Sequence, residues 1–453
     1  MDISRRRLVV LSALSGAVPV TTLAMPAVAA PLTTLGVDAT KLGVRAGGGA
    51  DQTNMLQSAI DQTAGARVPL VLGPGEYRTR ELKLPIGTQL VGVRGATRLI
   101  FSGGSAMISG PRADNVTLSG LVIDGDNRPL PEGGALVRLS EAGDLRIVDC
   151  DILGSGRNGI VLDQVAGTIA GNTIMGAADA AIFSRDGRGL TVQNNVIRNC
   201  GNNGILVWRS TSGDDGTLVL DNRIEDIDNK RGGSGQYGNA VNVFRAGNVM
   251  VRGNRISRAA FTAVRGNAAS NIQIVGNVIT EIGEVAIYSE FGFEGAVISN
   301  NTVDGAALGI VVTNFNEGGR LAVVQGNLIR NLKAKRPAGT NPADSAGIGI
   351  GVEADAAVTG NVIENAPNAG ISVGWGQHLR DVSIVGNVVR SAGFGIAVSV
   401  ASGAGTAVIS GNMIGGATRG AIVGMDFAKA VSGDLIKEHA RYANLQISGN
   451  RVR

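Results

Sequence analysis

The sequence predicts an all-β protein, a right-handed parallel β-helix of about 13 or more coils with an N-terminal capping helix and a short helix near the C-terminus. Three observations predict it. Glycine makes up 68 of 453 residues, the motif apolar-x-apolar-x-Gly-Asn-x-apolar recurs along the chain, and a second short apolar triplet lies between successive copies. The triplets alternate with period two, which indicates strands. Coils of about 23 residues, stacked ~4.8 Å apart, would form a rod of roughly 60 Å.

The repeated motif places an asparagine at one position of nearly every coil. In two earlier coils Leu121 and Cys150 hold that position. A buried amide without a partner is costly, so we predict that these side chains point into the coil and hydrogen-bond up and down the stack. The column is therefore interpreted as structural. Its members are Asn172, Asn195, Asn222, Asn254, Asn277, Asn301, Asn327, Asn361, Asn387, Asn412 and Asn450.

Residues 1–29 are predicted to be a twin-arginine signal peptide. The Arg5-Arg6 pair precedes an apolar run and an Ala27-Val28-Ala29 cleavage site. A retained membrane anchor is the alternative, but prolines interrupt the run and it is too short to span a bilayer convincingly. The prediction implies a periplasmic or secreted protein whose partner during export is the twin-arginine translocase.

Composition excludes several classes of function. Residues 1–29 hold three arginines and one aspartate, so the remainder has 38 basic and 36 acidic residues and no basic stripe for nucleic acid. No later stretch has eighteen unbroken apolar residues, so no stable membrane span is expected. Cys150 and Cys200 do not form a disulfide framework, and His378 and His439 are too isolated to predict a metal site. The cofactor and the oligomeric state stay open.

Residues 30–100 are predicted to be the N-terminal cap and entry coils, and residues 101–453 the β-helix repeats. Asp51 is expected to cap a helix that ends at Gly65, with the apolar stripe Met55, Leu56, Ala59 and Ile60. A second helix, at about 434–442, is expected to cover the last coil.

The segment from Gly43 to Gly92 resembles the entry module of pectate-lyase-like β-helix proteins, in which a "DxTxxLQxAI" helix precedes "PxGxY" and "LVGV". The Gly-Asn coils look like the repeat shared by pectate lyases, alginate epimerases and periplasmic copper-accessory proteins. With its twin-arginine start, the chain is similar to a family of twin-arginine-translocated β-helix repeat proteins. The resemblance covers nearly the whole chain and implies the fold. It transfers no catalytic set, because the Asp-Pro-His-Asp motif of the epimerases and the paired aspartates of polygalacturonases are absent.

Two insertions interrupt the regular spacing at the same point of the coil. They lie at 226–239 and 333–346, each before the second strand of its coil, so both are predicted to leave the same corner, four coils apart. Insertions in solenoids often mark the binding face. We therefore expect two walls with uninserted coils between them as a floor. A third insertion, near 211–216, leaves a different corner.

The floor between these walls is predicted to carry polar and aromatic side chains. Because side chains alternate with period two along a strand, three columns of side chains are expected to point outward. Other coils have mostly small or apolar residues at the same positions. The columns read Asn242, Arg265, Tyr288 and Val311; Phe244, Asn267, Glu290, Thr313 and Glu353; and Arg245, Phe291, Asn314 and Trp375.

These side chains suit an acidic or neutral polysaccharide, with acidic glycans preferred. The catalytic candidates are Arg265, to neutralise a uronate carboxylate, Tyr288, to transfer a proton, and Glu290, in a lyase or epimerase reaction. The substrate-binding candidates are Asn242, Arg245, Asn267, Phe291, Asn314, Glu353 and Trp375.

Two alternatives stay open. Glu290 and Glu353, two coils apart and roughly 9 to 10 Å from each other, reach the upper end for an inverting hydrolase pair. The second alternative is a non-catalytic structural or adhesive rod whose long side supports oligomerisation. Whether the protein is an enzyme is left undecided by the sequence.

Overall fold

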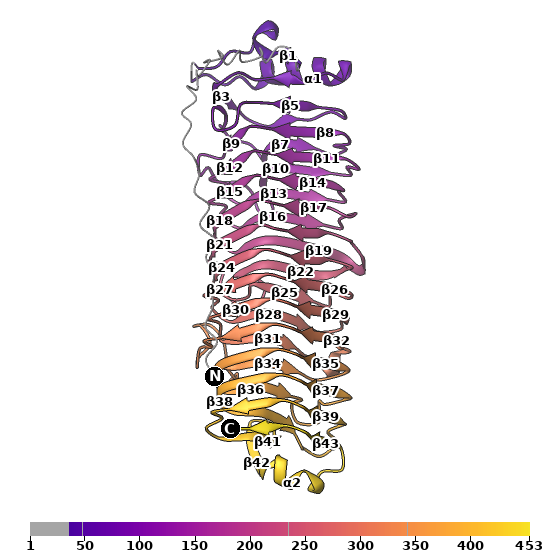
Figure 1. Ribbon diagram of the computed structural model, residues 1–453. Helices are drawn as coiled ribbons and strands as arrows, with labels where there is room; N and C mark the ends of the chain where they lie inside the picture. The colour runs from indigo at the N-terminus through magenta and orange to yellow at the C-terminus, as the bar shows by residue number, and fades with distance from the viewer. Residues whose placement is uncertain (1–35, 48, 234, 342) are drawn as a thin grey trace, which may run out of the picture.

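The computed structural model describes residues 36–453, apart from 48, 234 and 342. The predicted signal peptide lies outside the described residues. The rest of the chain winds into a parallel β-solenoid of about 14 turns, which confirms the predicted fold class. The coils stack into one long rod whose strands run across its axis (Figure 1).

The rod has three faces of parallel strands. Face 1 is a sixteen-stranded sheet that contains the Gly-Asn motif at its strand ends. Its strands are β1 (Val37–Asp38), β2 (Leu70–Val71), β5 (Gln89–Val91), β8 (Val116–Ser119), β11 (Leu145–Val148), β14 (Gly167–Ala170), β17 (Thr191–Gln193), β20 (Leu218–Leu220), β23 (Met250–Arg252), β26 (Ile272–Val275), β29 (Glu294–Ser299), β32 (Arg320–Gln325), β35 (Ala356–Thr359), β37 (Val382–Val385), β39 (Ala407–Ser410) and β43 (Leu445–Ser448).

Face 2 follows the asparagine in each coil. Its strands are β3 (Gly75–Thr79), β6 (Thr97–Phe101), β9 (Val122–Asp124), β12 (Asp151–Leu153), β15 (Thr173–Met175), β18 (Val196–Cys200), β21 (Arg223–Ile227), β24 (Arg255–Ala259), β27 (Val278–Thr280), β30 (Thr302–Asp304), β33 (Leu328–Arg330), β40 (Met413–Gly415) and β44 (Arg451–Val452). Two long strands, β36 (Val362–Val373) and β38 (Val388–Ser399), pass from face 2 into face 3 and join them.

Face 3 completes each coil and carries the second apolar triplet of the repeat. Its remaining strands are β4 (Leu82–Lys83), β7 (Ala106–Gly110), β10 (Ala135–Ser140), β13 (Asn158–Asp163), β16 (Ala180–Arg185), β19 (Asn203–Asp214), β22 (Asn239–Gly247), β25 (Val264–Asn267), β28 (Val285–Glu290), β31 (Leu308–Val312), β34 (Ile348–Val352) and β41 (Gly420–Asp426). A final strand, β42 (Lys429–Asp434), pairs antiparallel with β41.

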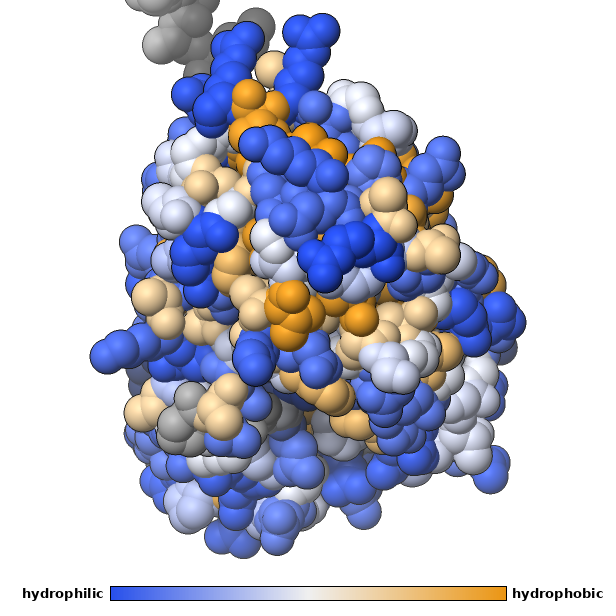
Figure 2. Space-filling model, turned by 90° about the horizontal axis from the view of Figure 1, so that it is seen from below, coloured by the Kyte–Doolittle hydropathy of each residue, from blue (hydrophilic) through white to orange (hydrophobic). Residues whose placement is uncertain are grey.

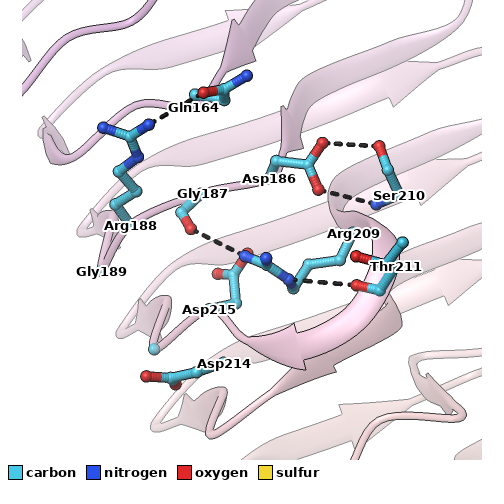
Figure 3. A pocket seen from close by; sticks show the side chains of 11 residues that line it. Gln164, Asp186, Gly187, Arg188, Gly189, Arg209, Ser210, Thr211, Asp214 and Asp215 are labelled. Carbon is cyan, nitrogen blue, oxygen red and sulfur yellow. Dashed lines mark hydrogen bonds between the residues drawn. The ribbon is translucent and has the colours of Figure 1, made fainter.

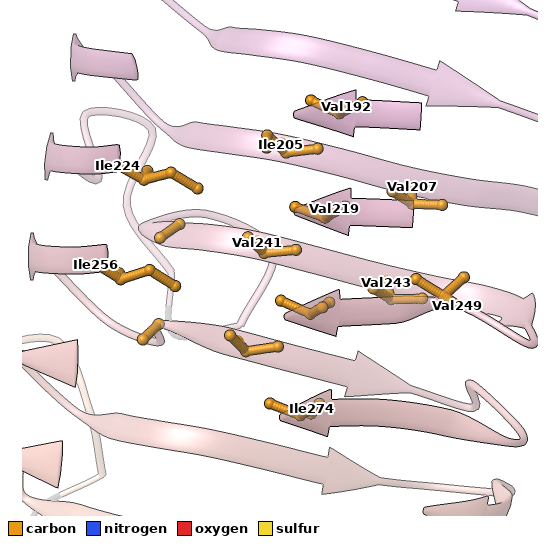
Figure 4. Packing of buried hydrophobic residues seen from close by; sticks show 14 of the residues in the cluster. Val192, Ile205, Val207, Val219, Ile224, Val241, Val243, Val249, Ile256 and Ile274 are labelled. Carbon is orange, nitrogen blue, oxygen red and sulfur yellow. The ribbon is translucent and has the colours of Figure 1, made fainter. Parts of the chain in front are cut away.

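The core is a set of β-branched columns that run along the rod axis. On face 2, Ile224 is in register with Ile256, and on face 3 Ile205 is in register with Val241. These side chains point inward and are fully or almost fully buried (Figure 4). Valine and isoleucine suit this position because their stiff, branched side chains pack well on a pleated surface.

The asparagine column forms the predicted ladder inside the coil. Asn254 donates its backbone N–H and its side-chain amide to Oδ1 of Asn277, at 2.9 and 3.0 Å. Asn277 repeats both bonds to Asn301, and the pattern continues from Asn172 to Asn450. The residue before each asparagine has a left-handed backbone, which explains why it is so often glycine, asparagine or aspartate.

Both ends of the rod are closed by helices, as predicted, with two corrections at the first. Helix α1 (Thr53–Ala66) continues through Gly65 and ends at Arg67, which takes the left-handed conformation itself. Asp51 accepts a hydrogen bond from the first turn, but Met55 is 45% exposed and lies outside the buried stripe. Among the described residues, none of the helices has the length and apolar character to cross a membrane.

The C-terminal end is covered by the β41–β42 hairpin and by α2 (Leu435–Glu438), which continues into a 3₁₀ turn (His439–Arg441). Leu435 is fully buried against the last coil. Seen from this end, hydrophilic residues cover most of the surface and hydrophobic residues form small separate patches (Figure 2). Such an end face limits stacking of one rod on another, as capping repeats must.

The two cysteines are buried in the coil interior and are not paired. Burial raises the pKa of both thiols to about 12. Only the thiolate reacts rapidly, so we expect neither cysteine to react with a chromogenic thiol reagent at pH 8 until guanidinium unfolds the protein. A Ser402→Cys variant, with the new thiol at an exposed turn, should react at once. Reaction of the native protein at the same rate as that variant would contradict the burial of Cys150 and Cys200.

Candidate functional site

Both predicted wall loops leave the corner between face 2 and face 3. Residues 228–238 join β21 to β22, and residues 331–347 join β33 to β34. The coils of β25, β28 and β31 lie between them and cross this corner in short turns. The prediction that the two loops share one corner is therefore confirmed. The two loops contact the coils between them through different residues.

The first loop lies directly over Arg265. The guanidinium donates to the carbonyl oxygen of Gly235 at 2.9 Å. On its other side it donates to Oε1 of Glu290, at 2.6 Å from Nε and 2.5 Å from Nη2. Asn267 adds a third hydrogen bond to the same carboxylate, at 3.0 Å. Arg265 thus joins the loop to the floor through an ion pair whose side chains are 9% and 4% exposed.

The register predicted for the floor is correct. Asn242 pairs with Arg265, which pairs with Tyr288 and then Val311, one coil after another. The Arg265 guanidinium lies 5.4 Å from the centre of the Tyr288 ring, a cation–π contact. The register places Arg265 beside Tyr288 and Asn267 beside Glu290, and the Arg265 side chain reaches diagonally to Glu290.

Burial controls the protonation of this cluster. It raises the pKa of Glu290, against the opposing charge of Arg265 and the hydrogen bonds from Arg265 and Asn267. Burial also raises the pKa of Tyr288, and the nearby charge of Glu290 raises it further. Tyr288 therefore holds its proton at neutral pH. It can donate a hydrogen bond to a ligand, but the phenolate needed for a general base is strongly disfavoured.

The second loop is fastened by Arg336, a residue that lies inside it. Arg336 donates to Oε1 of Glu284 at 2.8 Å and to the carbonyl of Ser345 at 2.8 Å, and Asp344 is 3.7 Å away. Burial raises the pKa of Glu284, opposed by the charge of Arg336. Lys333 adds a bond from its ammonium to the carbonyl of Ile282. The loop is thus tied back to the coil of β28.

A pocket of about 340 Å³ opens between this loop and face 3, and we call it the loop pocket. Tyr288 and Thr313 form part of its floor, and Glu353 and Trp375 close the side toward face 1. Glu353 accepts hydrogen bonds from the Thr313 hydroxyl at 2.5 Å and from the Phe315 amide at 2.7 Å. The volume of the loop pocket is at the lower end of the range for small-molecule sites. The loop pocket is lined by Tyr288, Leu308, Val311, Val312, Thr313, Arg336, Ala343, Asp344, Ser345, Ile348, Gly351, Val352, Glu353, Ser372, Gly374 and Trp375.

Three predicted site residues are not open to a ligand. Asn242, Arg265 and Glu290 are 4%, 8% and 3% exposed, because the first loop and the neighbouring coils cover them. The expectation that Arg265 meets a substrate carboxylate and that Glu290 takes part directly is corrected by this burial. The two side chains neutralise each other instead.

Three further candidates lie at the corner between face 3 and face 1. Arg245, Phe291 and Asn314 all have left-handed backbones at this corner, Arg245 within β22 and the other two after β28 and β31. Asn314 Oδ1 accepts a hydrogen bond from the Phe291 amide, and Arg245 lies over the ring of Phe244. They line up along the bend and lie outside the loop pocket. The structure thus brings Tyr288, Glu353 and Trp375 together and holds Asn267 on Glu290. Arg245, Phe291 and Asn314 stay outside the loop pocket.

Sequence reasoning missed Arg336, Asp344 and Glu284. The sequence feature that could have indicated Arg336 is the basic run "KAKR" of its loop, which an acidic residue in "PADS" follows in the same loop. A loop has no period from which to derive a register, so the distance over which Arg336 reaches back to Glu284 was not predictable.

The fold and this geometry define a right-handed parallel β-helix protein with a loop-walled site on one face. A model of the family described as "Right handed beta helix region" matches residues 96–224. A search of curated proteins found no match.

Several solved structures are similar to the chain in fold. The N-terminal fragment of gene product 12 of bacteriophage Phi29 has a TM-score of 0.56 and 16% identity, over 93% of this chain and 71% of that one. DFA-IIIase from Arthrobacter chlorophenolicus A6, in complex with GF2, has a TM-score of 0.51 and 16% identity, over 77% and 93%. Tailspike protein 3 of bacteriophage CBA120 has a TM-score of 0.51 and 13% identity, over 91% and 61%. At these identities the likeness is one of fold.

Proposed function

We propose that this protein binds an acidic polysaccharide, with one end or one ring of the glycan held in the loop pocket. The observation that carries the proposal is the meeting of Tyr288, Arg336, Glu353 and Trp375 around one opening of about 340 Å³. Aromatic side chains with a few fixed polar groups are typical of small-molecule and sugar sites. The solved relatives include a protein crystallised with GF2 and a phage tailspike, which is consistent with a ligand on this fold.

Each of the four side chains has a role in binding. Trp375 packs edge to face with Phe427, at 5.6 Å between ring centres, and its side chain is 42% exposed, so the exposed part of the indole can contact a sugar. Glu353 is oriented by Thr313 and Phe315 and accepts from sugar hydroxyls. The protonated phenol of Tyr288 donates a hydrogen bond. Arg336 has Nε on the Ser345 carbonyl and Nη1 on Glu284, and its side chain is 17% exposed, so Nη2 is the nitrogen that it offers to a uronate carboxylate.

A more specific proposal is that the protein acts as a lyase or an epimerase. The geometry supports such an activity less well than it supports binding. Both reactions need a base for the proton next to the carboxylate. Tyr288 is held in its neutral form, and the charge of Arg265 is already matched by Glu290. This pairing favours binding without turnover, so a non-catalytic adhesive rod is the second candidate function.

We also propose that the chain is exported by the twin-arginine route and acts in the periplasm or outside the cell. Support comes from the Arg5-Arg6 pair and the apolar run of residues 1–29. A polysaccharide ligand of the cell envelope would be met in that compartment.

The test combines binding and turnover in one set of titrations. Alginate, pectate and a neutral glucan are added to the protein, with calorimetry for binding and absorbance of unsaturated uronates for lyase activity. We expect the acidic glycans to bind, Trp375→Ala to weaken them by roughly tenfold, about 1.4 kcal/mol, and Arg336→Gln to reduce the preference over glucan. Met175→Ala, which removes a 37% exposed side chain on face 2, is the matched control. Absence of binding to every glycan would refute the proposal, and absorbance growth would establish the lyase version.

A further inference from the structure

A row of aromatic side chains crosses three coils of face 3 and leads into the floor between the two wall loops. The rings of Phe183 and Trp208 lie 5.2 Å apart edge to face, and those of Trp208 and Phe244 lie 5.4 Å apart. We call these three residues the aromatic ladder. All three are partly exposed. Three large aromatic side chains on consecutive coils are unusual in a chain with 3% aromatic residues.

The aromatic ladder is in register with the floor between the two wall loops. Trp208 pairs in register with Phe244, which pairs with Asn267, which pairs with Glu290. Trp375 is the second of only two tryptophans in the sequence and lines the loop pocket on the same face. Six coil steps separate β19 from β36, so the two indoles are separated by roughly 29 Å along the rod, at ~4.8 Å a step.

A polar pocket lies beside the ladder at the corner between face 3 and face 1 (Figure 3). Its volume is about 720 Å³, and it is formed by the turn that follows β16, by the last part of β19 and by the turn after β19. Its largest side chains are Arg188 and Arg209, and Arg209 follows Trp208 directly in the chain.

The groups in this polar pocket differ in how firmly they are held. Asp186 accepts from both the amide and the hydroxyl of Ser210, so its carboxylate is occupied. The Arg209 guanidinium contacts two backbone carbonyls only at 3.4 and 3.5 Å. These are long hydrogen bonds. Burial raises the pKa of Asp215, and the charge of Arg209 opposes this shift, so the guanidinium already has one carboxylate nearby. Arg209 can therefore exchange its two long backbone bonds for oxygen atoms of a ligand.

From this arrangement we infer that the aromatic ladder and the polar pocket form a second binding subsite for the same acidic glycan. A sugar face stacks on Trp208, next to the Phe244 ring that Arg245 covers, and Arg209 binds an oxygen of the glycan beside it. A glycan that fills both subsites lies along the rod axis and spans roughly 29 Å from Trp208 to Trp375. The inference rests on the proposed function. It adds a chain-length requirement that the loop pocket alone does not have.

Linked subsites bind a long ligand more tightly than a short one, because the second contact is intramolecular. Pectate or alginate oligosaccharides, whichever type the protein binds, are therefore titrated in order of increasing length. We expect affinity to rise until the oligosaccharide spans both subsites and then to level off. Trp208→Leu should weaken long oligosaccharides by roughly tenfold, about 1.4 kcal/mol, and leave the shortest ones unchanged. Unfolding curves establish that this variant is folded.

Two single-tryptophan variants give a direct readout. In Trp375→Phe the only tryptophan is Trp208, and in Trp208→Phe it is Trp375. Emission of Trp208 should change with long oligosaccharides only, whereas emission of Trp375 should change with all lengths. A response of Trp208 to no oligosaccharide, while Trp375 responds, would overturn the second subsite and leave the loop pocket standing. A response of Trp208 without any from Trp375 would instead overturn the loop pocket, and silence of both would overturn the two together.

Discussion

Asn277→Ala is expected to destabilise the protein by about 3 to 6 kcal/mol, because the substitution leaves several buried polar groups without partners. The Asn277 side chain accepts from the backbone N–H and the amide of Asn254 and donates to Asn301 and to the Val251 carbonyl. All of these groups lie in the coil interior, where water does not replace the lost bonds. Far-UV circular dichroism during urea unfolding measures the loss.

The matched control is Asn450→Ala at the end of the same ladder. Asn450 makes the same kind of bonds to Asn412 and Ile409, but it is only partly buried and only the short strand β44 follows it. Its partners are buried, but solvent can enter the space that the partly exposed side chain leaves. We therefore expect a loss of about 1 kcal/mol, near the net value of an ordinary hydrogen bond. Equal losses at the two positions would show that burial within the stack does not determine the stability that an asparagine contributes.

Arg265→Ala is expected to destabilise the protein by about 3 to 5 kcal/mol at neutral pH, since it leaves the Glu290 carboxylate buried without its partner. The same substitution removes the bond to Gly235 that holds the first loop on the floor. The double variant Arg265→Met with Glu290→Leu should recover most of the loss, because apolar side chains of similar size need no partner. Urea unfolding of Arg265→Met, Glu290→Leu and the double variant gives the coupling energy, and additive effects would contradict a direct pair.

The pH dependence of the Arg265→Ala variant follows from Glu290. Its pKa in the folded wild type is already above the ordinary value of 4.5, and loss of the arginine charge raises it further. The folded state then binds a proton more tightly than the unfolded state. The destabilisation should therefore be smallest below pH 4.5, grow as pH rises through the folded pKa, and stay constant above it. A loss that is largest in acid would have the wrong sign for this mechanism.

The repeat made most of the fold predictable from sequence. Gly-Asn at a fixed place in each coil dictates both the left-handed bend and the buried amide, and period-two triplets dictate which side chains enter the core. The same register correctly placed Asn242, Arg265, Tyr288 and Val311 in one column. Local rules suffice there because each coil repeats the geometry of its neighbour.

The candidate site was predictable only in part. Register shows that Glu290 and Arg265 are on the outward side of their strands, but it does not show that a loop covers them. The helix end was missed by a small margin: Ala66 is still helical, and the left-handed residue that follows it is Arg67 instead of Gly65. All three residues are exposed, and nothing in the structure explains this extension. At Arg265 and Glu290, by contrast, a long-range loop contact decided the outcome.

The sequence by itself determined the coil, the asparagine ladder, the corner from which both loops leave, and the face on which the polar and aromatic residues gather. These features depend on contacts between equivalent positions of adjacent coils, and the repeat shows which positions are equivalent. Only the tertiary structure decided which of those residues remain open. Arg336 reaches across 52 residues to Glu284, and Gly235 closes over Arg265 across 30. Such loop contacts have no period, and they left Tyr288, Glu353 and Trp375 as the residues that a ligand can meet.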